Sequence, residues 1–209
     1  MYSVEEIKEN YKSFSDSKIE NIAINESKDL RTEVLEILRN EILKRKLDAN
    51  LITWVNAETN YFTEKETLEL AEKIKKIKCP NCGEKNNELK GYEINKVFSF
   101  IIFYSRTIER RILCKRCGRN NNIISNLSIL LLGWWSRRGF LVTPYCLFKN
   151  IINSFSNEKI SNNVINEFIK QNNGMFRLHG INEENISNLI SLHNNNYEIP
   201  ETEEEEKLK

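Results

Sequence analysis

Four of the five cysteines in this 209-residue chain form two short pairs that could do metal chemistry. Each pair has two residues between its cysteines and a glycine directly after it, "CPNCG" at 79–83 and "CKRCG" at 114–118. A CxxC turn lets two thiolates converge on one ion, and zinc prefers four such ligands in a tetrahedron. Iron in a rubredoxin-like site uses the same geometry and is the alternative. The sequence therefore predicts a zinc site with the ligands Cys79, Cys82, Cys114 and Cys117.

The residues around the two pairs indicate what role the metal has. Four thiolate ligands leave no position open for water, so we expect a structural site rather than a catalytic one. We expect Gly83 and Gly118 to adopt a positive φ where each turn closes. Pairs with this spacing are typical of a reducing compartment, which predicts a cytoplasmic location, with membrane association as an addition. Cys146 stands alone in an apolar stretch and is interpreted as a core residue.

Groups for acid–base or nucleophilic catalysis do not cluster in the sequence. The histidines are His179 and His193, and both are interpreted as surface or packing residues. There is no P-loop, no Gly-rich dinucleotide turn and no HExxH helix. We therefore expect that the chain is not an enzyme.

The pattern of apolar residues indicates which elements position the cysteines. Alternating β-branched and aromatic residues predict strands at 88–94, 96–105 and 106–114, between the two pairs. Helical periodicity dominates on both sides of this region. The sequence predicts an α+β fold with a helical N-terminal module (1–77), a four-cysteine zinc ribbon with a small antiparallel sheet (78–122), an apolar segment with C-terminal helices (123–197) and an acidic disordered tail (198–209).

Capping signals and apolar stripes mark individual helices. Ser3 and Glu6 form a capping box in front of the first one. The clearest apolar stripe predicts a helix within residues 27–47. A later helix is expected to end at the sequence "NNG", with Gly174 just beyond its last turn, and another is expected at about 182–193.

The region after the second cysteine pair resembles a known group of proteins. The apolar run, the sequence "GWW", a later glycine and the pair "TP" follow the ribbon in order. Residues 78–174 resemble largely uncharacterised bacterial zinc-ribbon proteins, in which a CxxCG…CxxCG ribbon precedes a GWW…G…TP motif. The resemblance implies a zinc ribbon and brings no catalytic residue with it. The matching residues beyond the cysteines are Gly133, Trp134, Trp135, Gly139, Thr143, Pro144 and Asn150, whereas Ser136, Arg137 and Arg138 depart from the group's pattern.

Three interpretations of the GWW segment remain open. The apolar run that ends in it is too short for a membrane span of about 20 residues. The rings could pack on the ribbon, they could lie at a membrane surface with the arginines on phosphates, or they could bind a protein. The candidate partner or membrane contacts are Trp134, Trp135, Arg137, Arg138 and Phe140.

Positive charge is concentrated around the cysteine pairs. The chain has a net charge of +1, but residues 78–149 alone carry +9. Phe103 and Tyr104 lie nearby and could stack on bases. The candidate contacts with nucleic acid or another anion are Arg106, Arg110, Arg111, Lys115, Arg116 and Arg119.

These observations favour a non-catalytic, zinc-stabilised interaction module whose main partner is another protein. A protein of the inhibitor or immunity type fits this pattern. A nucleic-acid-binding zinc ribbon and a peripheral membrane protein that uses the GWW segment are the alternatives.

Overall fold

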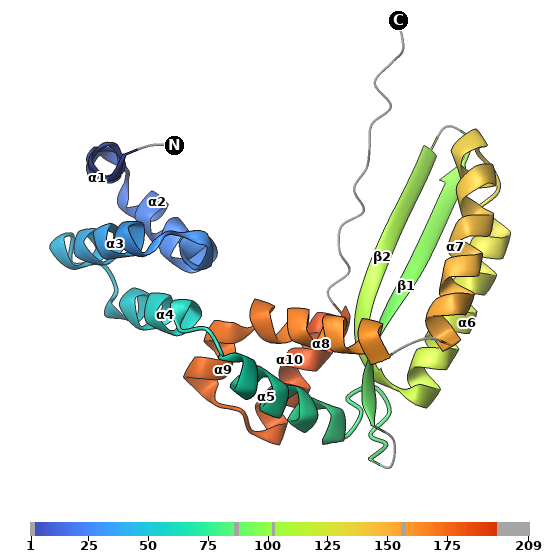
Figure 1. Cartoon of the computed structure of the whole chain (residues 1–209). Helices are drawn as coiled ribbons and strands as arrows, with labels where there is room; N and C mark the ends of the chain where they lie inside the picture. Colours follow the sequence, from blue (N-terminus) through green and yellow to red (C-terminus); the bar gives the residue numbers. More distant parts are fainter. Residues whose placement is uncertain (1–2, 86–87, 102, 156–157, 196–209) are drawn as a thin grey trace, which may run out of the picture. The chain divides into compact units, whose positions relative to one another are not determined.

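The computed structural model describes residues 3–85, 88–101, 103–155 and 158–195 (Figure 1). Helices at both ends of the chain and one two-stranded antiparallel sheet confirm the predicted α+β fold. The chain divides into two compact units, one of residues 1–63 with 170–181, the other of residues 64–169 with 182–209. The predicted acidic tail, 198–209, lies outside the described residues.

The first unit consists of short helices around one apolar core. The capping box at Ser3 is present, because the Glu6 amide donates to the Ser3 hydroxyl and the Glu6 carboxylate accepts from the Ser3 amide. Its core contains the fully buried side chains of Ile19, Leu38 and Val55. The elements are α1 (Val4–Ser13), α2 (Asp16–Asn21), the π-helical turn η1 (Ile22–Glu26), the 3-10 turn η2 (Ser27–Asp29), α3 (Thr32–Lys44), α4 (Ala49–Thr59) and α9 (Asn173–His179).

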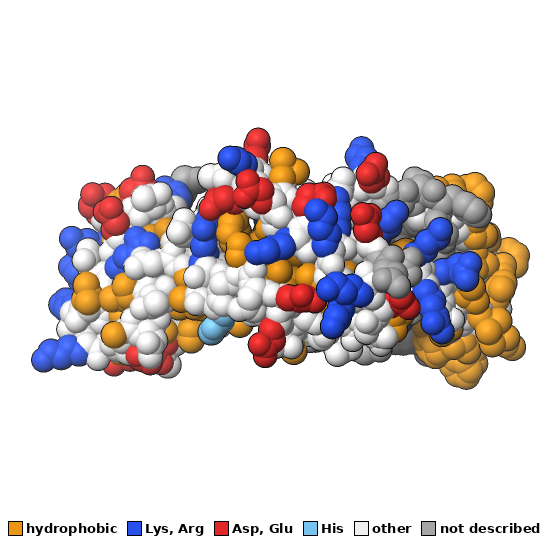
Figure 2. All heavy atoms as spheres, turned by 90° about the horizontal axis from the view of Figure 1, so that it is seen from below, with side chains coloured by type: hydrophobic (Ala, Val, Ile, Leu, Met, Phe, Trp, Pro, Cys, Tyr) orange, Lys and Arg blue, Asp and Glu red, His pale blue; other side chains and the backbone are white. Residues whose placement is uncertain are grey.

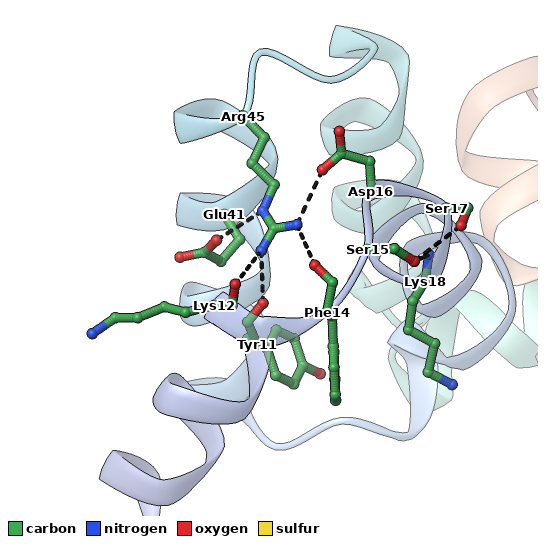
Figure 3. A network of polar contacts seen from close by, with 9 residues as sticks. All are labelled: Tyr11, Lys12, Phe14, Ser15, Asp16, Ser17, Lys18, Glu41 and Arg45. Atoms are coloured by element: carbon green, nitrogen blue, oxygen red, sulfur yellow. Dashed lines mark hydrogen bonds and ion pairs between the residues drawn. The ribbon is translucent and has the colours of Figure 1, made fainter.

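Arg45, at the end of α3, joins three segments of this unit (Figure 3). Its guanidinium donates to the Glu41 carboxylate at 3.0 Å and to the Asp16 carboxylate at 3.0 Å. It also donates to the carbonyls of Tyr11 at 2.8 Å and Phe14 at 2.6 Å, at the end of α1. Carbonyls at a helix end have no intrahelical partner, so Arg45 satisfies them while it fixes α1 against α3.

Helix α9 attaches to the end of α4 through one asparagine. The Asn173 amide group lies 2.9 Å from the Ala57 carbonyl oxygen and 3.0 Å from that of Glu58. The amide of Gly174 donates to the Glu58 carboxylate at 2.9 Å. The prediction that Gly174 follows the end of a helix is wrong, because it lies inside α9. A Cβ at this position would collide with the Glu58 carboxylate, so glycine is needed for close approach.

The second unit is built on a long β-hairpin. Its strands pair antiparallel from Leu89 opposite Cys114 to Phe100 opposite Phe103. Three strands were predicted, and this is wrong: 88–94 and 96–100 form one strand, and the turn begins at Ile101, where φ is 48°. The elements are α5 (Glu64–Lys76), β1 (Leu89–Phe100), β2 (Phe103–Cys114), α6 (Lys115–Leu132), α7 (Arg137–Phe155), α8 (Glu158–Gln171, to 169 in this unit) and α10 (Glu183–Asn195).

Helices cover different parts of the hairpin. Both α6 and α7 pack along β1 (Figure 1). Near the cysteines, the Ser161 hydroxyl of α8 accepts from the Gly91 amide at 2.9 Å, and Asn194 of α10 exchanges two hydrogen bonds with the backbone of Ile112. The helix predicted to end near the sequence "NNG" and the helix predicted at about 182–193 are confirmed as α8 and α10. Phe168 and Ile190 are fully buried there, so the base of the hairpin has an ordinary apolar core.

Candidate metal centre and interaction surface

The four paired cysteines meet at the base of the hairpin. Cys79 and Cys82 lie between α5 and β1, Cys114 ends β2, and Cys117 lies in the first turn of α6. Their sulfur atoms all lie within 4.8 Å of one another, and those of Cys82 and Cys114 are 3.7 Å apart. A tetrahedral zinc with Zn–S bonds of about 2.3 Å needs S–S distances of about 3.8 Å. The donor set therefore fits a tetrahedral metal ion.

The two cysteine pairs are built differently. At the first pair, the Gly83 amide donates to the Cys79 carbonyl at 2.8 Å, and the predicted positive φ of Gly83 is confirmed at 72°. At the second pair the prediction is wrong, because Gly118 is helical and its φ is not positive. A Cβ at Gly118 would collide with the ring of Tyr92. The second glycine thus makes room for a side chain of β1.

The thiols of the centre have different acidities. Burial raises the pKa of Cys117 to about 12, although its sulfur accepts a hydrogen bond from Asn81 at 3.2 Å. Burial also raises the pKa of Cys114. Burial acts in the same direction on Cys79, but backbone N–H donors, including those of Cys114 and Cys82, outweigh it and lower the pKa. A metal ion binds thiolates, so binding at neutral pH has to displace protons from the buried thiols.

The predicted arginine cluster does not form one surface. Arg106 donates to the side chain of Asn95 at 3.1 Å and lies over the ring of Tyr145 at 5.4 Å. Arg110 lies 3.3 Å from the carboxylate of Glu167 on α8. These two arginines therefore have contacts within the unit.

The other members of the cluster lie near the metal centre. Arg111 pairs with Glu109 at 2.8 Å. Arg111, Arg116 and Arg119 line a pocket of about 750 Å³, together with Cys82 and Cys117. The remaining lining is mainly asparagine, with Leu113, Ile123 and Ile124 as its apolar part. Lys115 is exposed in the first turn of α6.

Polar side chains hold α6 and α7 against β1. Asn150 of α7 accepts from the Asn95 amide at 2.8 Å and donates to the Asn95 carbonyl at 2.9 Å. Ser125 of α6 donates to the same carbonyl at 3.0 Å, and the Asn122 side chain donates to the Asn150 carbonyl at 3.1 Å. All four side chains are buried. The inner sides of these two helices are therefore largely polar.

Close backbone contacts hold the helices at the turn end of the hairpin. The Thr143 hydroxyl donates to the Gly133 carbonyl at 2.8 Å, and so does the Ser99 hydroxyl of β1. A Cβ at Gly133 would collide with Thr143, and one at Gly139 with the Gly133 carbonyl. Gly133, Gly139, Thr143 and Asn150 thus each make a contact that positions α7.

The outer sides of α6 and α7 are apolar, the reverse of the usual order. Figure 2 shows a broad orange area on the side of the second unit where these helices lie. Leu131, Leu141 and Phe148 are 64%, 75% and 65% exposed. We name this surface the α6–α7 apolar face; it consists of Ile123, Ile124, Leu127, Leu130, Leu131, Leu132, Trp134, Trp135, Phe140, Leu141, Tyr145, Phe148, Ile151 and Ile152.

The candidate residues of the GWW segment belong to this face or border it. Trp135 and Phe140 are 63% and 62% exposed, so their rings do not cover the hairpin as the packing interpretation requires. Trp134 contacts Phe140 edge to face, with ring centroids 5.9 Å apart. Arg137 and Arg138 are exposed in the first turn of α7.

Most of the apolar face was missed in the sequence, although a signal was present. Apolar residues recur at helical spacing as 123, 124, 127, 130, 131 and again as 141, 145, 148, 151, 152. This is the usual mark of a helix side that faces a core. The polar residues Asn122, Ser125 and Asn150 occur between these apolar positions. In the structure the polar residues, and not the apolar ones, lie on the buried side of the helices. His193 makes an edge contact with Phe168, and Cys146 is fully buried, as predicted for packing residues.

Comparison of the chain with family models, with curated proteins and with solved structures found no match. Among the described residues, no helix combines the length and the hydropathy needed to cross a membrane.

Proposed function

We propose that this chain is a non-catalytic, zinc-stabilised interaction module that binds its partner through the α6–α7 apolar face. The observation that carries the proposal is the reversed polarity of the two helices, with buried amides and exposed leucines. Its 14 side chains, about half exposed at roughly 100 Å² each, amount to on the order of 1,400 Å². The largest apolar patch of a typical monomer covers about 300–600 Å². An apolar area of this size is expected to be covered when the protein functions.

A structural zinc ion supports this surface. The spacing of the sulfur atoms suits zinc, and Cys114 and Cys117 lie where β2 passes into α6. A bound ion would therefore fix the start of α6 against the hairpin. Four thiolates leave the ion no open position, so the role proposed for it is structural.

The metal proposal is tested by elemental analysis of the purified protein, with Cys79→Ser as the comparison. We expect one zinc ion per chain, and its loss in the variant together with the cooperative unfolding of the second unit. Iron in place of zinc, or no metal in protein purified without chelator, would overturn it.

The surface proposal is tested with a face variant that carries Leu127→Gln, Leu131→Gln, Phe148→Gln and Ile152→Gln. The matched control variant carries Leu43→Gln, Leu68→Gln, Leu178→Gln and Leu192→Gln, at exposed apolar residues elsewhere. Sedimentation is measured with and without dodecyl maltoside micelles, and zinc content reports the fold.

We expect the wild type and the control variant either to self-associate or to bind micelles. The face variant should do neither while it retains its zinc. If the face variant and the wild type sediment alike under both conditions, the apolar face is not the binding surface.

Nucleic-acid binding is the second candidate, because Arg111, Arg116 and Arg119 converge on one pocket. With at most three phosphates neutralised, log K should change with log salt by a slope of about −3 on duplex DNA. We expect Arg116→Ala to reduce that slope by about one. Binding that does not change between about 50 and 500 mM salt would exclude this candidate.

A further inference from the structure

The charged side chains of α6 and α7 themselves are all of one sign. The sequence contains no aspartate or glutamate between Glu109 and Glu158, a stretch that includes all of α6 and α7. Cations lie at both ends of the face: Arg116 and Arg119 in the first turns of α6, and Arg137 and Arg138 in the first turn of α7. Figure 2 shows blue side chains beside the orange area. An apolar surface whose two helices carry cations and no acidic residue is complementary to an anionic partner.

The aromatic residues suit a boundary between water and lipid. Trp134, Trp135 and Tyr145 carry a polar group on an apolar ring, and all three are exposed. Such rings favour the headgroup level of a bilayer. Phe100 and Ile101, at the turn end of the hairpin, are 60% and 68% exposed. A backbone bridge joins Phe100 to Trp135, so the hairpin end and the apolar face are continuous.

The reversed polarity of the helices also indicates which medium surrounds them. In water, an amphipathic helix buries its apolar side, whereas Asn122 and Asn150 are buried here and Leu131 and Leu141 are not. In lipid, the apolar side faces outward, and the polar groups are satisfied inside the protein. The bonds of Asn150 with Asn95 satisfy that condition.

A second copy of the chain is the less suitable occupant. In a twofold dimer the same surface patch meets itself. Such a contact would bring Arg137 and Arg138 near the same cations of the other copy, and neither α6 nor α7 offers an acidic residue to pair with them. A layer of anionic lipid headgroups supplies the missing negative charge.

We propose that the α6–α7 apolar face lies in the headgroup region of an anionic lipid bilayer, with its leucine and phenylalanine side chains directed toward the acyl chains. The inference rests on the proposed function and names the partner of the same face. The two helices lie on the membrane and do not cross it, since neither is long and apolar enough. The basic residues at the ends of the face contact lipid phosphates.

The proposal is tested by co-sedimentation of the full-length, zinc-loaded protein with vesicles. One set contains phosphatidylcholine with about 30% phosphatidylglycerol, which supplies the negative surface potential, and the other contains phosphatidylcholine alone. We expect the wild type and the control variant to pellet with the anionic vesicles. The face variant should bind at least about 10,000-fold more weakly, because each of its four substitutions removes roughly 100 Å² of apolar surface and so costs tenfold or more in partition.

The charge contribution is measured with Arg137→Gln and Arg138→Gln together, against Lys8→Gln and Lys159→Gln as exposed controls. Each arginine near an anionic surface contributes roughly fivefold to binding, so the double variant should lose about 20-fold or more on anionic vesicles. On neutral vesicles it should bind like the wild type. Equal losses on both kinds of vesicle would contradict the charge argument.

The outcomes separate this inference from the proposed function. Wild-type protein that binds micelles or self-associates but stays in the supernatant with anionic vesicles would overturn the membrane proposal and leave the interaction module standing. A stable dimer that does not bind vesicles would assign the face to a second copy. Identical behaviour of wild type and face variant in every assay would overturn both.

Discussion

Replacement of Asn150 by leucine should destabilise the second unit strongly. Its side chain accepts from the backbone amide of Asn95 at 2.8 Å and from the Asn95 side chain at 3.1 Å. It donates to the Asn95 carbonyl and to the Asn126 side chain, both at 2.9 Å. Leucine has nearly the same volume but makes none of these bonds, so Asn150→Leu removes the hydrogen bonds without a large cavity.

The magnitude follows from the groups that remain without these bonds. The Asn95 carbonyl keeps the bond from Ser125 at 3.0 Å. The backbone amide and the side-chain amide of Asn95 lose the bonds to Asn150, and the Asn95 residue is completely buried. Each buried donor without a partner costs about 1–3 kcal/mol, and the apolar gain of leucine offsets about 1 kcal/mol. We expect a net loss of about 1–5 kcal/mol in the free energy of unfolding.

Urea unfolding of zinc-loaded protein measures this loss. Trp54 belongs to the first unit, so in a Trp54→Phe background the emission of Trp134 and Trp135 reports the second unit alone. Asn163→Leu, at an exposed position of α8, is the matched control and should change the free energy by about 0.5 kcal/mol or less. If Asn150→Leu and Asn163→Leu had the same effect, the amide network would not be what holds α7 to β1.

Three further changes test other parts of the fold. Arg45→Met should lower the free energy of unfolding of the first unit in urea titrations, because it removes the donor to the buried Glu41 carboxylate and to the Phe14 carbonyl; an effect no larger than that of the exposed Lys44→Met would contradict this. Gly118→Ala should weaken zinc retention in a competition with a chelator, since its methyl group would displace the ring of Tyr92, and unchanged retention would show that the contact is dispensable. Burial raises the pKa of Glu58, against the hydrogen bond from Gly174. A raised folded-state pKa stabilises the protein below the unfolded-state pKa, and that contribution is lost as the pH rises through the folded-state value. Glu58→Gln should therefore gain stability relative to wild type as the pH rises above the ordinary glutamate pKa of about 4; a stability difference that does not change as the pH rises to neutral would refute it.

The metal centre was predictable because ligand spacing depends on local chemistry. Two CxxC pairs can bring four sulfur atoms together whatever the rest of the chain does. The second glycine was not predictable in the same way, because its neighbour is Tyr92, a residue on another element. The arginine cluster was likewise an incomplete guide to a binding surface, because Arg110 forms ion pairs with Glu93 on β1 and with Glu167 on α8.

The hairpin turn was hidden because nothing in its sequence marks it. The run "FSFIIFYS" contains no glycine, asparagine or proline, and it predicts a continuous strand. The strand register decides the position of the turn: with Leu89 opposite Cys114, the pairing ends at Phe100 opposite Phe103. Cys114 lies beside the first cysteine pair in the four-cysteine cluster, so long-range pairing rather than local propensity decides where this chain turns.

Helix α4 and the apolar face were missed for related reasons. Asp48 caps α4 by accepting from the Asn50 amide at 2.9 Å, which was the available signal, but the helix has only a weak apolar stripe. For α6 and α7 the apolar stripes are clear. The usual rule that the apolar side of a helix faces the core, however, assigns the wrong side of these two helices to the core. Buried asparagines decide the orientation there, and their partners lie on β1 and on each other's helix.

The position of Asn173 has a consequence for the order of events during synthesis. The carbonyls at the end of α4 receive their hydrogen bonds from a side chain 116 residues later in the chain. At about 5–20 residues per second, a ribosome needs on the order of ten seconds to supply it. Although α1 to α4 emerge first, their unit cannot be completed until the hairpin and its cysteines have left the ribosome. The unit that is translated first is therefore completed only after α5 to α8 have been made, and α10 of the second unit still follows.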